Sequence, residues 1–202
     1  MSVPAKPAVL NGIRVIGNGS THDMLLFDGT ETLAGAVSRV LCIALDQGHA
    51  AISIATREHQ DVIDEQLSLR GIDVARTLQS GQYRKFDALE TLAKISVDGE
   101  LDGGRFDELV GAVLQPALKT YARVCLFGEM VALLWDAGQR DAAVRLEKMW
   151  NDVVRAKPVV LHCAYPQSAA TDPDLAHAFN KICIEHCEIL AADGAKPDLL
   201  AR

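Results

Sequence analysis

The sequence has no long apolar run and no excess of basic residues. None of its 202 residues belongs to a stretch approaching the roughly 18 unbroken apolar residues of a membrane helix. Its beginning does not combine a charged segment with an apolar core, so no signal peptide is predicted. Lys and Arg number 20 against 27 Asp and Glu, a formal net charge of -7. Nucleic acids and anionic membranes attract clustered Lys and Arg, so neither is expected as a partner.

Paired cysteines and linkers are also missing. The five cysteines are an odd number at irregular spacing, which predicts reduced thiols and a cytoplasmic location. Repeats, low-complexity tracts and linkers are absent as well, so one domain is expected. Hydrophobic residues make up 49% and charged residues 23%, which is typical of a globular protein with a substantial core. The expected boundaries are a flexible extension over residues 1–21, a domain over 22–190 and a loose tail over 191–202.

Apolar strands alternate with amphipathic helices along the chain. Apolar runs at residues 24–27, 51–55, 124–127 and 159–161 predict buried strands. Helical spacing predicts helices over residues 31–46, 102–121 and 174–190, and one beginning near Asp141. Pro116 is expected to kink the second of these helices or to mark a break in it. Thr30, Thr56 and Asp87 are expected to cap helices. This alternation predicts a single α/β domain with a mostly parallel sheet covered on both faces.

The turn after the first predicted strand stands where a nucleotide-binding domain holds its phosphate loop. Such a loop needs several glycines, a Lys for charge and a Ser or Thr for Mg²⁺. This turn has only Gly29, no Lys, and an acidic Asp28 that repels anions. An ordinary capped turn is therefore predicted. Glu129 follows a buried strand, as acidic residues do in many nucleotide hydrolases, and either contacts a ligand or binds neighbouring backbone amides. Without a complete catalytic motif, no enzyme activity and no cofactor are predicted.

Cysteine and histidine side chains gather near the end of the chain. Cys183, His186 and Cys187 share one predicted helix, where spacings of three and four residues place them on one face. Cys163 could complete a tetrahedral metal site if that helix packs across its strand. The alternative is that these cysteines are small buried apolar side chains. Trp150 lies at helical spacing with apolar residues and is expected in the core, with the wall of an apolar pocket as the alternative.

Several short motifs resemble one known family. They are His22-x-x-x-x-Phe27-Asp28, Ile54-Ala55-Thr56 followed by His59, Gly128-Glu129-Met130-Val131, and Cys163-Ala164-Tyr165-Pro166. Together they resemble the MEDS domain, the sensory domain of methanogens and methylotrophs seen in dichloromethane-responsive regulators. The resemblance implies an α/β core of the RecA/KaiC type without a functional phosphate loop. It also implies sensing of hydrocarbon derivatives or other small molecules, usually beside a histidine kinase, an anti-sigma-like module or a DNA-binding domain.

The resulting prediction is a cytoplasmic sensory domain that binds a small organic ligand. The chain leaves no room for a kinase or helix-turn-helix domain, so output is expected through a partner such as a histidine kinase or an anti-sigma-type regulator. Ligands of doubly wound sheets lie outside the carboxyl ends of the strands. That rule selects Phe27, Asp28, His59, Phe127, Glu129, His162 and Tyr165 as ligand-binding residues.

Other interpretations of the sequence stay open. One is a degenerate nucleotide-binding enzyme that uses Glu129. Another is a metal or redox sensor built from Cys163, Cys183, His186 and Cys187. The oligomeric state is also open, with a homodimer as one option.

Overall fold

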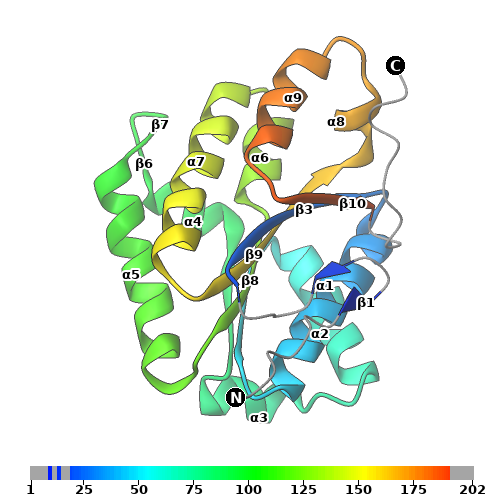
Figure 1. Cartoon of the computed structure of the whole chain (residues 1–202), viewed down its shortest axis with the longest axis vertical. Helices are drawn as coiled ribbons and strands as arrows, with labels where there is room; N and C mark the ends of the chain where they lie inside the picture. Colours follow the sequence, from blue (N-terminus) through cyan, green and yellow to red (C-terminus); the bar gives the residue numbers. More distant parts are fainter. Residues whose placement is uncertain (1–8, 11–12, 15–18, 192–202) are drawn as a thin grey trace, which may run out of the picture.

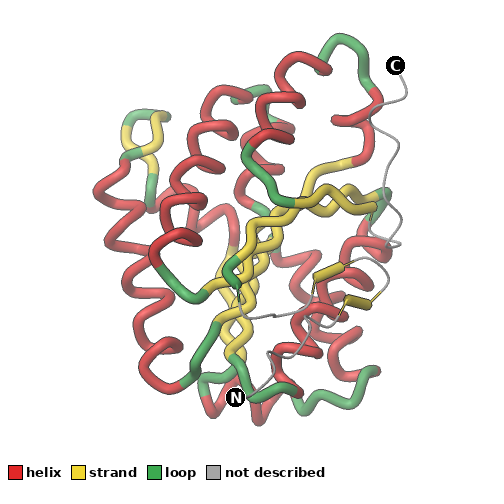
Figure 2. Tube along the Cα trace, in the orientation of Figure 1, coloured by secondary structure: helices red, strands yellow, loops and turns green. Residues whose placement is uncertain are grey.

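A six-stranded parallel sheet runs through the middle of the molecule (Figures 1 and 2). The computed structural model describes residues 9–10, 13–14 and 19–191. The strand order is β10-β3-β9-β8-β4-β5, and every neighbouring pair is parallel. The strands are β3 (Thr21–Phe27), β4 (Ala50–Ala55), β5 (Tyr83–Asp87), β8 (Val124–Gly128), β9 (Val159–Pro166) and β10 (Glu188–Ala191). The described residues form a single α/β domain, as predicted; its relation to the RecA/KaiC type stays a prediction.

Helices cover both faces of this sheet. One face, here called the α1 face, carries α1 (Thr30–Asp46), α2 (Arg57–Leu69) and α3 (Val74–Ser80). The opposite face, here called the α7 face, carries α4 (Ala88–Lys94), α5 (Gly103–Thr120), α6 (Met130–Asp136), α7 (Arg140–Ala156), α8 (Gln167–Thr171) and α9 (Ala176–Ile184). Figure 1 shows the two helical layers on either side of the strands. Because both faces are covered, the central strands are apolar throughout rather than alternating.

Successive strand residues belong to the two cores in turn. In β3, Met24 and Leu26 pack in the core of the α7 face, whereas Leu25 packs in that of the α1 face. The same alternation continues in β9, where Cys163 and Tyr165 face α7. His22 therefore points to the α7 face and Phe27 to the α1 face, because side chains two residues apart share a face.

Two small antiparallel pairs lie outside the main sheet. They are β1 (Val9–Leu10) with β2 (Ile13–Arg14), and β6 (Ser96–Val97) with β7 (Glu100–Leu101). The turn joining β6 to β7 has positive φ at Asp98 (50°) and Gly99 (85°). This geometry matches the twist of a tight hairpin. No helix among the described residues is both long enough and apolar enough to cross a membrane.

Helix ends agree with the sequence at some positions and differ at others. Thr56 and Asp87 cap α2 and α4, as predicted. The prediction for Thr30 is wrong, because Gly29 occupies the cap position of α1 and Thr30 is its first residue. The α7 helix starts at Arg140, before Asp141. Pro116 lies inside an uninterrupted α5, which packs on the sheet through a stripe of buried residues: Phe106, Val110, Val113, Leu114 and Ala117.

The strand β9 is longer than predicted. Residues 159–161 were expected to form the strand and His162 to lie at its end, but β9 continues to Pro166. It lies between β3 and β8, and it pairs with β3 from Thr21↔Val160 to Phe27↔Pro166. This pairing places His162 in the middle of the sheet, where it is 0% exposed. Ladder hydrogen bonds on both sides thus extend the strand beyond its most apolar part.

The prediction of one long helix over residues 174–190 is wrong. The helix α9 ends at Ile184, and the chain then adds β10 to the sheet edge beside β3. The backbone N–H of Cys187 donates to the carbonyl of His22, which draws the chain toward β3. Ala191 belongs to β10, and residues 192–202 of the expected tail lie outside the described residues, as does most of the expected extension over 1–21.

Trp150 is a core residue, as expected, and its removal tests the packing of the α7 face. It is 1% exposed and meets Phe106 edge-on, with ring centroids 5.0 Å apart. We expect Trp150→Ala to lower the free energy of unfolding by about 3–5 kcal/mol, because the truncation loses apolar contacts and leaves a cavity. Urea denaturation measures the change. Leu89→Ala, at an exposed position of α4, is the control and should cost less than about 0.5 kcal/mol. Equal losses of unfolding free energy in the two variants would contradict the placement of Trp150 in the core.

Candidate functional site

Glu129 and His59 meet at the carboxyl ends of two adjacent strands. Glu129 follows β8, and His59 lies in the first turn of α2, which follows β4. The helices after these two strands leave on opposite faces, since α2 packs on the α1 face and α6 on the α7 face. Adjacent parallel strands whose connections separate in this way leave a crevice at their carboxyl ends, where doubly wound sheets bind ligands.

The Glu129 carboxylate is buried and fully engaged. The residue is only 3% exposed. The backbone N–H of Thr56 donates to its Oε2 at 2.8 Å, and His59 Nδ1 lies 2.6 Å from its Oε1. His59 Nε2 in turn lies 3.3 Å from the hydroxyl of Thr30, and the ring of Phe27 meets the imidazole edge-on at 6.2 Å between centroids. Residues at or just after the ends of β3, β4 and β8 thus meet here. The Glu129–His59 site below means Phe27, Thr30, Thr56, His59 and Glu129.

The carboxylate controls the protonation of the imidazole. The hydrogen bond to Glu129 raises the pKa of His59 above its ordinary value of 6.5, against the opposing effect of burial, and the charges of Glu129 and Glu58 add to the rise. Burial and repulsion from Glu129 raise the pKa of Asp136. The site therefore favours an imidazolium–carboxylate pair.

The structure brings together three of the seven residues predicted to bind a ligand. Phe27, His59 and Glu129 are in contact, and Asp28 lies beside them on the exposed turn. The Asp28 turn is closed on itself, because the Thr32 hydroxyl donates to the carbonyls of Asp28 and Gly29 at 2.6 and 2.8 Å. This geometry is that of an ordinary helix-start turn.

The other three predicted residues lie elsewhere. Phe127 and His162 are register partners within the sheet and are both 0% exposed. Burial, with a smaller contribution from His22, lowers the pKa of His162 to about 4, so this imidazole is neutral at pH 7. Tyr165 points to the α7 face, where its hydroxyl donates to Glu147. Tyr165 lies near the carboxyl end of β9, but its side chain contacts Glu147 rather than Glu129.

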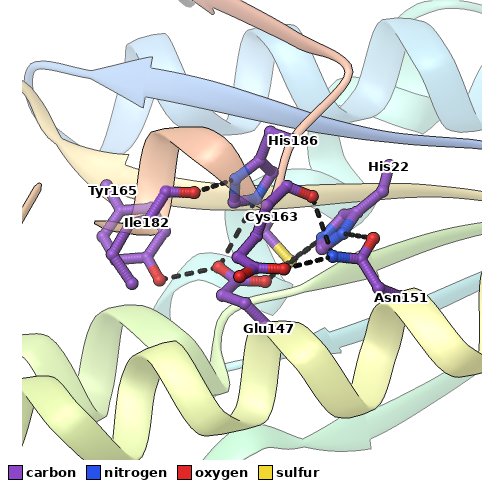
Figure 3. A network of polar contacts seen from close by, with 8 residues as sticks. His22, Glu147, Asn151, Cys163, Tyr165, Ile182 and His186 are labelled. Atoms are coloured by element: carbon purple, nitrogen blue, oxygen red, sulfur yellow. Dashed lines mark hydrogen bonds and ion pairs between the residues drawn. The ribbon is translucent and has the colours of Figure 1, made fainter. Parts of the chain in front are cut away.

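A second polar group is buried on the α7 face, where it surrounds Glu147 (Figure 3). His22 comes from β3, Cys163 and Tyr165 from β9, Glu147 from α7, and His186 from the turn between α9 and β10. The side chains of His22, Glu147 and His186 are 1%, 0% and 0% exposed. The group is called the Glu147 cluster below. It joins four segments that are far apart in the sequence.

Short distances connect every member of the Glu147 cluster. His22 Nε2 lies 3.1 Å from Glu147 Oε2 and 3.2 Å from Cys163 Sγ. Cys163 Sγ lies 3.4 Å from Glu147 Oε2, and His186 Nε2 lies 3.4 Å from Glu147 Oε1. The hydroxyl of Tyr165 donates to Oε1 at 2.7 Å. The carboxylate is thus the common partner of all four neighbours.

Burial and charge act in opposite directions on this carboxylate. Burial raises the pKa of Glu147, but the attraction of His186 and His22 outweighs burial and holds the pKa below its usual range. Burial likewise lowers the pKa of His186, but attraction to Glu147 leaves it above 6.5. Burial and the Glu147 charge raise the pKa values of Cys163 and Tyr165 well above their ordinary values. These shifts favour an ionised Glu147 beside a protonated His186.

The sequence identified this cluster only in part. Of the candidate metal ligands, Cys163 and His186 belong to it, whereas Cys183 is half-buried and Cys187 exposed, and neither joins the set of ligand atoms. His22 and Glu147 were missed as ligands. Glu147 did carry a signal, because it lies one residue from Leu146 and three from Trp150 on the buried stripe of α7. A carboxylate there must have partners, since an isolated buried charge is very costly.

Three cavities of the described structure lie outside both polar groups. The largest, about 550 Å³, lies between α4, α5 and β5 and includes Arg84, Lys94 and Arg105 in its wall. A second, of about 260 Å³, opens at the carboxyl ends of β4 and β5 beside Ala55 and Arg57. A third, of about 430 Å³, lies near Gly71 and Gln82. The second cavity is the one adjacent to Thr56, whose N–H binds Glu129.

Comparison with protein families gives one match. The model of the methanogen/methylotroph, DcmR sensory domain (MEDS) matches residues 21–181. The chain belongs to the MEDS family. A search of the curated proteins found no match. The match contains the Glu129–His59 site and four members of the Glu147 cluster, with His186 lying just beyond it. MEDS domains are sensory domains, so the family fits a sensory role and a protein that is not an enzyme.

The pairing of His59 with Glu129 predicts a pH-dependent stability of this MEDS domain. Because the pKa of His59 is higher in the folded state than in the unfolded state, protonation of His59 stabilises the fold. This stabilisation is complete below the unfolded-state pKa of about 6.5 and is lost as the pH rises through the folded-state pKa. We expect Glu129→Gln to lower the His59 pKa, as measured by NMR titration. The loss of unfolding free energy should be largest below about pH 6.5 and should shrink toward alkaline pH.

The matched control is Glu58→Gln, which makes the same charge change beside His59. Because Glu58 contributes least among the causes of the raised pKa, this variant should lower the pKa of His59 less. If both variants lowered the pKa of His59 equally, the hydrogen bond to Glu129 would not be the main cause of the raised pKa.

Proposed function

We propose that this MEDS domain senses a small organic molecule at the Glu129–His59 site and signals through a partner protein. The observation that carries the proposal is the buried carboxylate of Glu129, bound to His59 and to the amide of Thr56 at the carboxyl ends of two adjacent parallel strands. Buried titratable pairs at the carboxyl ends of parallel strands are typical of ligand sites. The MEDS match supports the sensory part of the proposal.

The chemistry of the site favours a small, mostly apolar ligand with one polar group. Phe27 supplies an apolar ring beside His59, and the imidazole and carboxylate supply a donor and an acceptor. Because the two charges compensate each other, a strongly charged ligand would leave one of them unpaired. Apolar walls give affinity, and a few polar groups fix the orientation of the ligand.

The site is also connected to the ends of three helices. Glu129 immediately precedes α6, Thr56 caps α2, and Thr30 begins α1. A ligand that displaces His59 from Glu129 would release the link between α6 on one face and α2 on the other. The helices that begin at the site pack on both faces of the sheet, so the proposed output passes through contact of these helices with another protein.

Ligand binding should raise the melting temperature by mass action, since the ligand binds the folded state. The measurement is a thermal-shift screen of small alcohols, amines, halocarbons and organic acids at increasing concentration. We expect a hit whose shift is lost or strongly reduced in both Glu129→Gln and His59→Gln. Tyr165→Phe is the control, because its hydroxyl binds Glu147 on the other face and should leave the shift unchanged. A hit that responds to Tyr165→Phe but not to Glu129→Gln would move the site to the α7 face.

A degenerate nucleotide-binding enzyme is the second candidate, favoured by an acidic residue directly after β8. The Asp28 turn argues against it, because the backbone N–H of Asp28 already donates to the Thr32 hydroxyl and the turn has no Lys to neutralise a phosphate. We therefore expect neither hydrolysis of ATP or GTP nor tight binding of either. Isothermal titration and a phosphate-release assay test this. Micromolar affinity that disappears in Glu129→Ala would instead favour the enzyme.

A further inference from the structure

The centre of the Glu147 cluster has the composition of a metal site. His22, Glu147, Cys163 and His186 each offer one ligand atom, and these atoms all lie within 4.8 Å of one another. Two imidazole nitrogens, a thiol sulfur and a carboxylate oxygen form a donor set typical of zinc and related divalent transition ions. We propose that these four side chains bind one divalent ion of the zinc class. The set differs from the one expected from sequence, since His22 and Glu147 replace Cys183 and Cys187.

The hydrogen bonds of His22 prepare it for this role. Its Nδ1 lies 3.0 Å from Asn151 Oδ1. The orientation of that amide follows from its other partners, because Asn151 Nδ2 donates at 2.9 Å to both the carbonyl and the carboxylate of Glu185, which can only accept. His22 Nδ1 must therefore carry the proton. In the neutral ring, the lone pair of Nε2 points at Cys163 and Glu147.

His186 is oriented by the same logic. Its Nδ1 donates to the carbonyl of Ile182 at 2.8 Å, which leaves the lone pair of Nε2 to face Glu147 (Figure 3). Among the described residues this buried Nε2 forms no close hydrogen bond, and its ion-pair partner is Glu147 Oε1 at 3.4 Å. Metal-binding histidines are held in this manner, with the outer nitrogen donating to a carbonyl, a carboxylate or a comparable acceptor. Both rings of the cluster meet this requirement.

The spacing also fits a four-coordinate ion. Zinc bonds of about 2.0–2.3 Å in a tetrahedron place neighbouring ligand atoms about 3.3–3.8 Å apart. His22 Nε2, Cys163 Sγ and Glu147 Oε2 are separated by 3.1, 3.2 and 3.4 Å, which is close to this spacing. All four ligand atoms lie within 4.8 Å of one another, so His186 would close the remaining distance on binding. The buried Glu147 carboxylate requires a compensating positive charge. Protons on the rings supply it in the metal-free state, and the ion replaces them.

Four protein ligands leave no open position on the ion, which is the arrangement of structural rather than hydrolytic sites. Binding requires Cys163 to lose its proton, because the thiolate is the ligand, and the proton is released to solvent. The bound ion would join β3, β9 and α7 to the turn that leads into β10. Tyr165 would continue to donate to Glu147 from outside the ligand set. The cluster lies on the opposite face of the sheet from Glu129, so the two proposals can fail separately.

The test uses the full chain with Zn²⁺ and Co²⁺ as probes. Elemental analysis after reconstitution with zinc and gel filtration should find a single ion per chain. The cobalt form should show intense visible bands of a tetrahedral ion, and an ultraviolet charge-transfer band from the thiolate of Cys163. Zinc should also raise the melting temperature, and a chelator should reverse the rise.

Variants separate this site from the other cysteines. Cys163→Ser should abolish the charge-transfer band, whereas Cys183→Ser and Cys187→Ser should keep both the band and the affinity. Asn151→Ala removes the group that orients His22 and should weaken zinc binding about 10–100-fold. The wild-type cobalt spectrum carries the test even if a variant fails to fold. Absence of stoichiometric metal, a cobalt spectrum without a thiolate band, or loss of the band in Cys183→Ser or Cys187→Ser would each overturn the proposal.

Discussion

The pairing of β3 with its neighbours is the constraint on which both polar groups depend. β3 lies between β10 and β9 in the sheet. Its second residue, His22, reaches the α7 face and the Glu147 cluster, and its last residue, Phe27, reaches the α1 face and His59. A register shift of one residue would exchange the two faces and disperse both groups. Ladder bonds to both neighbours, from Glu188↔Asp23 on one side and Thr21↔Val160 on the other, fix that register.

The two groups use their carboxylates differently. Glu129 is held by a backbone amide and one imidazole at the rim of the sheet, where His59 remains partly accessible. Glu147 is enclosed, and histidine, cysteine and tyrosine side chains supply its partners. An enclosed carboxylate must keep a compensating cation, because burying an unpaired charge is far more costly than any single hydrogen bond recovers.

Local sequence patterns predicted much of the fold and selected the main residues of the Glu129–His59 site. The apolar runs indicated four of the six strands of the main sheet, and Phe27, His59 and Glu129 were selected because each lies at or just beyond a predicted strand end. The same rule failed for Tyr165, because position near a strand end does not say which face a side chain occupies. The helix predicted over residues 174–190 ended early, because hydrogen bonding of Cys187 to His22 overrides local helical preference.

The sequence by itself determined the α/β class, the family and the absence of a phosphate loop, since each depends on residues that are close along the chain. Only the tertiary structure decided that His22, Glu147, Cys163 and His186 meet within 4.8 Å. They come from two neighbouring strands, a helix and a turn, and no periodicity links positions so far apart. Sheet register and helix packing bring them together, and these depend on contacts across the whole domain rather than on any local pattern.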